Sequence, residues 1–71
     1  MLKSYLRHRM ADLKIDDITT LVKRSGVSRN TINKLYRSQD VETVKIGTLI
    51  QLCNALNCNL SDLVEYFPEK Q

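Results

Sequence analysis

The chain has 71 residues with a net charge of +3, and 42% of its side chains are apolar. This length allows one small domain and leaves no room for a separate sensor or catalytic domain beside it. One thin core is expected, stabilised by tightly packed helices or by a second subunit. No stretch approaches the roughly 18 apolar residues of a membrane span, and basic side chains interrupt the N-terminal segment. Neither a membrane segment nor a signal peptide is predicted, and the expected location is the cytoplasm.

The charges are unevenly distributed along the chain. Residues 1–45 carry ten basic and five acidic side chains, whereas residues 46–71 carry Lys70 against Asp62, Glu65 and Glu69. The first part therefore has a net charge of +5 and the second a net charge of −2. This separation favours a basic surface that meets a polyanion and a neutral or acidic opposite side, with a merely solvated charge distribution as the alternative.

Side chains suited to catalysis or metal binding are scarce. His8 is the single histidine, so no nucleophile and base can be paired and no catalytic residue is predicted. Cys53 and Cys58 are too few and too irregularly spaced for a zinc site or a disulfide framework, and both are expected to be reduced thiols. The chain is therefore predicted not to be an enzyme and to bind no metal, cofactor or small-molecule ligand.

The first predicted helix covers residues 2–13. Its apolar side chains recur at steps of four, four and three on one helical face: Leu2, Leu6, Met10 and Leu13. The other face carries Lys3, Arg7 and Lys14, which are equally compatible with solvent exposure and with contact to a phosphate backbone.

Two short helices follow, predicted for residues 18–25 and 28–37. Asp17 precedes the first as an N-cap, and Gly26 ends it because only glycine adopts a left-handed conformation at little cost. Ser28 caps the second, in which Ile32 and Leu35 face the core. The remaining positions of that helix are polar or aromatic, which folding alone does not require, so the helix is expected to contact a partner.

The C-terminal part predicts two more helices, at residues 45–57 and 61–67. The first has a strong apolar face and ends at Asn57, which tolerates a left-handed conformation. The second is expected to be capped by Ser61, to bury Leu60, Leu63, Val64 and Phe67, and to stop at Pro68. No β-alternation is evident, so the fold class is all-α, with five helices in one domain over residues 1–71.

From Leu21 to Ile32, and again from Val44 to Tyr66, the chain resembles the Cro/C1-type (XRE-like) helix-turn-helix family of phage and bacterial regulators. The shared features are Gly26, the capping Ser28 and the apolar Ile32, together with matching flanking helices. The resemblance implies a compact lambda-repressor-like DNA-binding domain whose second and third helices form the helix-turn-helix. Two departures are Ile18, where many members have Gln, and Val22, where Ala is common.

The resemblance also implies which side chains meet DNA. Contacts to base edges are expected from five residues: Ser28, Arg29, Asn30, Asn33 and Lys34. Arg29 suits bidentate bonding to guanine, and an asparagine suits adenine. Contacts to the DNA backbone are assigned to five others: Thr19, Thr31, Tyr36, Arg37 and Lys45. Tyr66 and Phe67 are expected either to form a dimer contact or to be, respectively, a surface and a core residue.

These observations predict sequence-specific binding of double-stranded DNA by a small transcriptional regulator. A repressor that acts by occupying its operator, as a monomer or a homodimer, is the simplest form. The alternative is a protein-interaction module, such as an antitoxin-like or anti-repressor partner, that uses the same fold.

Overall fold

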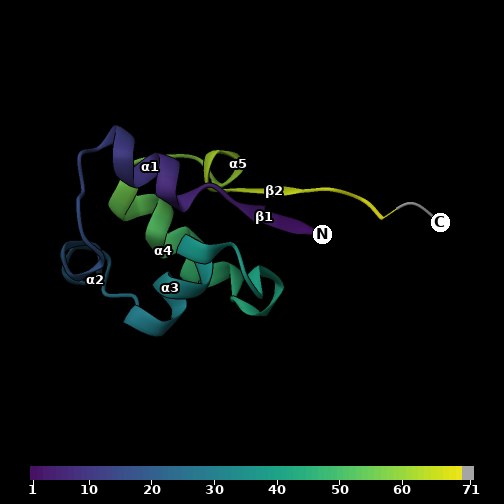
Figure 1. Ribbon diagram of the computed structural model, residues 1–71, viewed down its shortest axis with the longest axis horizontal. Helices are drawn as coiled ribbons and strands as arrows, with labels where there is room; N and C mark the ends of the chain where they lie inside the picture. Colours follow the sequence, from purple (N-terminus) through teal and green to yellow (C-terminus); the bar gives the residue numbers. More distant parts are fainter. Residues whose placement is uncertain (70–71) are drawn as a thin grey trace.

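A computed structural model describes residues 1–69, so Lys70 and Gln71 of the predicted domain lie outside the described residues. Within that range the elements follow the order β1 (Leu2–Ser4), α1 (Leu6–Asp12), α2 (Ile18–Ser25), α3 (Arg29–Arg37), the 3-10 turn η1 (Val41–Thr43), α4 (Ile46–Leu56), α5 (Leu60–Leu63) and β2 (Val64–Tyr66). Five α-helices form the body, and two short strands extend from it toward the chain termini (Figure 1). The predicted helical fold class is confirmed, with a small sheet added.

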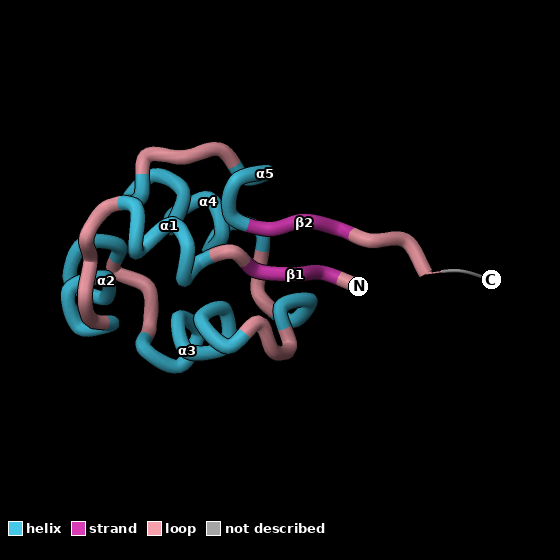
Figure 2. The backbone as a smooth tube through the Cα atoms, turned by 45° about the horizontal axis from the view of Figure 1, so that its top comes forward, coloured by secondary structure: helices cyan, strands magenta, loops and turns pink. Residues whose placement is uncertain are grey.

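The prediction of a first helix over residues 2–13 is wrong at its beginning. Residues 2–4 form β1, which pairs antiparallel with β2 so that Leu2 lies opposite Tyr66 and Ser4 opposite Val64. The two strands run side by side (Figure 2). Two side chains satisfy the other edge of β1, because the Leu2 N–H donates to Glu42 Oε1 at 3.2 Å and the Ser4 N–H to Ser38 Oγ at 3.0 Å.

The end of the first helix also differs from the prediction. α1 stops at Asp12 because Lys14 takes a left-handed conformation, with φ 56°, and the Ile15 N–H bonds back to the Met10 carbonyl at 2.9 Å. This arrangement brings the apolar side chain after the turn against the last turn of the helix. Ile15 and Met10 are accordingly both buried, whereas Leu13 is 44% exposed.

The fifth predicted helix, residues 61–67, is mostly wrong. α5 covers only Leu60–Leu63, and its N-cap is Asn59 rather than Ser61. The Asp62 carboxylate accepts from the Asn59 N–H at 3.0 Å, which holds the helix start. Because the chain becomes extended at Val64, Phe67 follows a strand and is 40% exposed instead of completing the core.

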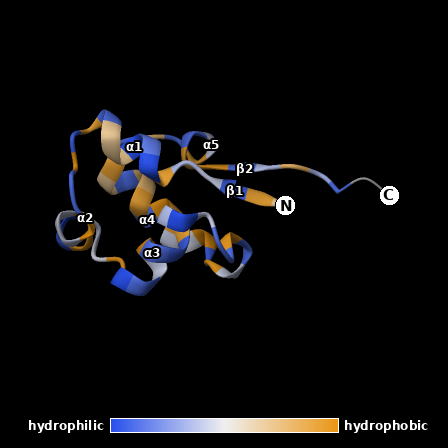
Figure 3. Ribbon diagram, viewed as in Figure 1, coloured by the Kyte–Doolittle hydropathy of each residue, from blue (hydrophilic) through white to orange (hydrophobic). Residues whose placement is uncertain are grey.

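The core is one apolar cluster to which all five helices contribute. Its fully buried members lie on α1, α2, α3, α4, α5 and η1: Leu6, Leu21, Ile32, Leu35, Leu52, Leu63 and Val41. α4 is the most apolar helix and runs through the middle, while α3 lies at the edge of the body and is mostly hydrophilic (Figure 3). None of the helices among residues 1–69 is both long and apolar enough to cross a membrane.

Candidate nucleic-acid interface

The start of α2 is fixed by Asp17, as predicted. Its carboxylate accepts from the Thr20 N–H at 2.6 Å, which satisfies one of the free N–H groups of the first turn. Hydrogen bonding from Thr20 lowers the pKa of Asp17, and the charges of Lys23 and Arg29 lower it further. The first turn of α2, which carries Thr19, is thereby ordered.

The turn between α2 and α3 depends on Ser25 as well as on Gly26. Gly26 has the left-handed conformation that the sequence predicted, with φ 74°, and its N–H donates to the Val22 carbonyl at 2.9 Å. The buried hydroxyl of Ser25 donates to the Leu21 carbonyl at 2.7 Å and accepts from the Val27 N–H at 3.1 Å. One side chain therefore satisfies backbone groups on both sides of the turn.

α4 holds the same turn from outside. The Gln51 side-chain amide donates to the Ser25 carbonyl at 2.6 Å, and its Nε2 atom lies 3.1 Å from where a Cβ on Gly26 would stand. A side chain at position 26 would thus be strained by the backbone conformation and crowded by Gln51. This contact fixes the angle at which α3 leaves α2.

α3 turns one face inward and one outward. Ile32 and Leu35 are completely buried, as predicted, and the Ser28 side chain caps the helix by accepting from the Thr31 N–H at 3.3 Å. With about 3.6 residues per turn, Asn30, Asn33 and Arg37 lie on the side opposite the two buried residues. The outward face therefore consists of amide and guanidinium groups, which match the donor and acceptor pattern of base edges.

Arg29 and Thr19 form a link between the first turns of the two helices. The Arg29 guanidinium donates to Thr19 Oγ1 at 2.8 Å, and both residues are exposed. At the same end of α3, Ser28 Oγ donates to Thr31 Oγ1 at 3.0 Å. Candidates for base contact and for backbone contact are thus neighbours at this end, and Thr19 orients the guanidinium of Arg29.

Lys34 lies on the flank of α3 that faces η1. Its ammonium is 3.5 Å from Thr43 Oγ1, at the limit of a hydrogen bond, so the side chain is loosely held. Lys45 is exposed at the N-cap position of α4, where its side chain makes no capping bond.

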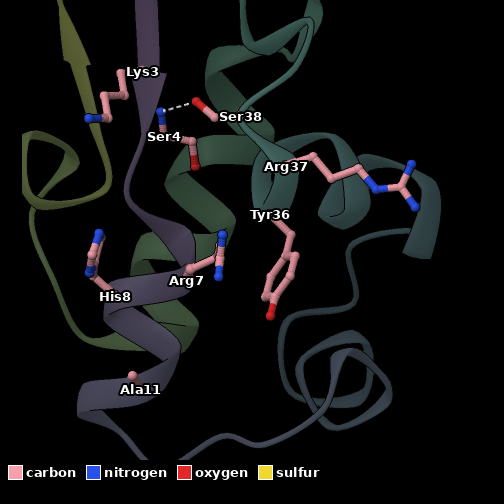
Figure 4. A pocket seen from close by; sticks show the side chains of 8 residues that line it. All are labelled: Lys3, Ser4, Arg7, His8, Ala11, Tyr36, Arg37 and Ser38. Atoms are coloured by element: carbon pink, nitrogen blue, oxygen red, sulfur yellow. Dashed lines mark hydrogen bonds between the residues drawn. The ribbon is translucent and has the colours of Figure 1, made fainter.

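Tyr36 lies on the opposite flank, facing α1. The Arg7 guanidinium carbon is 5.3 Å from the centroid of its ring, a cation–π contact. Beside this pair is a hollow of about 550 Å³, whose upper end in Figure 4 is formed by Ser4 and Ser38. Arg37 extends away from the hollow in that view, so its stem borders the hollow and its charged end does not.

The two candidates for a dimer contact lie elsewhere. Tyr66 is in β2 and is 64% exposed, and Phe67 directly follows it. Tyr66 therefore belongs to the pair of strands and Phe67 to the segment after it, and neither residue is part of α2 or α3.

The cysteines lie at the C-terminal end of α4. Cys53 is buried, and this burial is the main cause that raises its pKa to about 11, with the neighbouring Cys58 as the second cause. The raised pKa disfavours the reactive thiolate. Among residues 1–69, no three His, Cys, Asp or Glu side chains gather in a way that would hold a metal ion.

Sequence reasoning missed three residues that shape this surface: Ser25, Gln51 and Arg7. A serine in the last turn of a helix and an exposed glutamine on a distant helix carry no local signal for a shared turn. Arg7 was recognised as basic, but nothing in its sequence neighbourhood indicates that it lies on Tyr36.

Comparison with known protein families gives an independent result. A family model described as the Cro/C1-type HTH DNA-binding domain matches residues 5–69. The match covers every helix of the structure and excludes only β1 and the chain ends. No curated protein matches the chain at a significant level.

Proposed function

The chain belongs to the Cro/C1-type HTH DNA-binding domain family, and we propose from this that α3 reads a specific sequence in the major groove of double-stranded DNA. The observation that carries the proposal is the outward face of α3, where polar side chains are held at a fixed angle by the Ser25 and Gln51 contacts. In this proposal the protein regulates transcription as a repressor, by occupying its operator.

The part of α3 up to Lys34, together with the cap of the helix, supplies the base contacts in this proposal: Ser28, Arg29, Asn30, Asn33 and Lys34. Arg29 is the strongest candidate because Thr19 orients its guanidinium while the residue remains exposed. A bidentate arginine–guanine or asparagine–adenine pair contributes about 1–3 kcal/mol of discrimination between bases. The second set contacts phosphates and fixes the register without reading bases: Thr19, Thr31, Tyr36, Arg37 and Lys45.

The test is a selection of binding sites from random duplexes, followed by affinity measurements on the selected site with Arg29→Ala and Asn33→Ala. Each variant is expected to bind the site about 5- to 150-fold more weakly and to lose its preference at one base position. Arg9→Ala and Asn54→Ala are matched controls, since Arg9 pairs with Asp12 on α1 and Asn54 is exposed on α4. Unchanged affinity and selectivity in both α3 variants would refute the proposed role of α3.

The alternative function is binding of a protein partner through the same fold. Salt dependence separates the two, because DNA binding that neutralises several phosphates weakens steeply, with a log–log slope of about −0.9 per phosphate. A shallow slope, together with no preference among duplexes, would favour the protein-interaction module.

We further propose that two copies associate through the end of the molecule that carries β2. Met1 and Phe67 exchange backbone hydrogen bonds of 2.8 and 2.7 Å, so the alternation of an antiparallel ladder turns the N–H and C=O of Tyr66 outward. An outward pair of this kind can bond to its own copy across a two-fold axis. An apolar hollow of about 580 Å³ adjoins it, bordered by Leu2, Val44, Ile46, Leu60 and Val64.

Sedimentation equilibrium tests the association. The parent chain is expected to show a concentration-dependent dimer, and Tyr66→Pro, which removes the outward N–H, is expected to weaken it at least tenfold. Leu13→Ala removes an exposed apolar side chain from the residue that follows α1 and is the matched control. A parent chain that stays monomeric at about 1 mM would contradict the homodimer. In a dimer, the two α3 helices would meet half-sites about 34 Å apart.

A further inference from the structure

The hollow between β1, α1 and the end of α3 brings together basic side chains from separate parts of the sequence. Lys3, Arg7 and Arg37 border it, together with Tyr36 and Ser38, and no carboxylate lines it (Figure 4). The Arg37 guanidinium extends away from the hollow, and the Lys3 ammonium lies 5.3 Å from the centroid of the Tyr5 ring, so Arg7 is the cation that faces the space. No carboxylate opposes its charge there, and the hollow therefore favours an anion.

Arg7 is the best placed of these groups to bind that anion. Its guanidinium carbon lies 5.3 Å from the centroid of the Tyr36 ring, a cation–π contact that restrains the group, and the side chain remains exposed. Among the described residues, no carboxylate forms an ion pair with Arg7. A flat guanidinium with a free edge donates two parallel hydrogen bonds to phosphate oxygens more readily than an ammonium group does.

Ser38 adds a neutral donor beside Arg7. Its hydroxyl oxygen accepts from the Ser4 N–H at 3.0 Å, which orients the side chain toward the rim of the hollow. That contact uses a lone pair and leaves the hydroxyl proton available for an oxygen of the anion. Lys3 and Arg37 border the hollow with their stems, while the Lys3 ammonium lies over the Tyr5 ring and the Arg37 guanidinium extends away from the hollow.

The position of the hollow relative to α3 indicates where the anion comes from. At about 1.5 Å per residue, the end of α3 at Arg37 lies about 12 Å along the helix axis from its start at Arg29. The major groove is also about 12 Å wide. If the start of α3 contacts base edges, its end therefore reaches the border of the groove, where the sugar–phosphate backbone runs.

We propose that the hollow binds one phosphate group of the DNA backbone, with Arg7 as the principal donor and Ser38 as the second. This inference rests on the proposed function, and it adds to the DNA contact surface a residue of α1 that does not belong to the helix-turn-helix. The contact is independent of base sequence and fixes the register of α3 in the groove.

The test compares three full-length variants on a selected duplex and on an unrelated duplex, over a range of salt concentrations. Arg7→Gln is expected to lose about eightfold in affinity for both duplexes at 0.1 M salt and to lower the salt slope by about 0.9. Arg7→Lys keeps the charge and is expected to restore the slope. Arg9→Gln removes the same charge from the same helix at a residue paired with Asp12, and is the control.

Neutral methylphosphonate groups, placed one at a time along the selected duplex, locate the contact. At one position the neutral linkage is expected to lower the affinity of the parent for the duplex by about eightfold. The same linkage should not lower the affinity of Arg7→Gln further, since both changes remove the same interaction. A general loss of stability in Arg7→Gln would not produce this dependence on a single phosphate.

The outcomes separate this inference from the proposed function. If the parent selects a sequence but Arg7→Gln matches Arg9→Gln in slope and affinity, and no phosphate shows the coupling, the inference is refuted and the role of α3 stands. A parent that binds no duplex would refute both.

Discussion

The Ser25 hydroxyl is the smallest feature on which the helix-turn-helix geometry depends. It joins the Leu21 carbonyl to the Val27 N–H across the turn, in a buried environment. Ser25→Ala leaves the Val27 N–H without this partner and is expected to lower the free energy of unfolding by about 1–3 kcal/mol. Urea denaturation measures the change. Ser61→Ala, at an exposed serine of α5, is the control and should stay within about 0.5 kcal/mol of the parent.

Asp17 gives the stability a defined dependence on pH. Its folded-state pKa lies below the ordinary value of 3.8, so the charged cap contributes in full above that value and is lost as the pH falls through the lowered pKa. Asp17→Asn keeps a capping oxygen but no charge. The difference in unfolding free energy between parent and variant should therefore be constant from about pH 7 to 5 and shrink toward about pH 2. An equal difference in unfolding free energy at about pH 7 and at about pH 2 would contradict the role of the Asp17 charge.

Local residue patterns predicted the caps of α2, α3 and α4 and the buried positions of the helix-turn-helix. Asp17, Gly26, Ser28 and Asn57 act where expected because a cap satisfies backbone groups within a few residues of itself. The role of Ser25 was not predicted, because it depends on the burial of its hydroxyl and on a turn that brings the Val27 N–H close to it.

At the scale of elements, α4 stabilises the turn between α2 and α3. Gln51→Leu removes the hydrogen bond to the Ser25 carbonyl and is expected to lower the free energy of unfolding by about 0.5–1.5 kcal/mol. The loss should appear first as faster hydrogen exchange at the Val27 amide, by up to about tenfold, because the turn opens locally. Asn54→Leu changes another exposed amide on α4 and should leave that exchange rate unchanged. Equal exchange rates at the Val27 amide in the two variants would contradict this role of α4.

The two strands were the elements that local patterns did not predict. Leu2 continues the helical spacing of Leu6 and Met10, and its pairing with Tyr66 joins opposite ends of the chain. Such long-range pairing has no local signature in a three-residue strand. The side chains that satisfy the outer edge of β1, Ser38 and Glu42, are likewise distant in sequence.

For the whole molecule, the uneven charge distribution predicted a basic side but not its shape. The hollow at Arg7 and Tyr36 forms only when β1, α1 and the end of α3 converge, and the exposed β2 edge exists only because residues 64–66 leave the helical path. The structure thus separates two surfaces that the sequence mixes along its length, a basic surface around α3 and an apolar one beside β2.

The most direct test of the account is a titration of the labelled chain with its selected duplex, in which amide chemical shifts are followed by NMR. The largest changes are expected at Thr19 and at residues 28–38, with a second group around Arg7. Changes confined to β2, α5 and the start of α4, or none at all, would contradict the central claim that α3 carries the DNA contact.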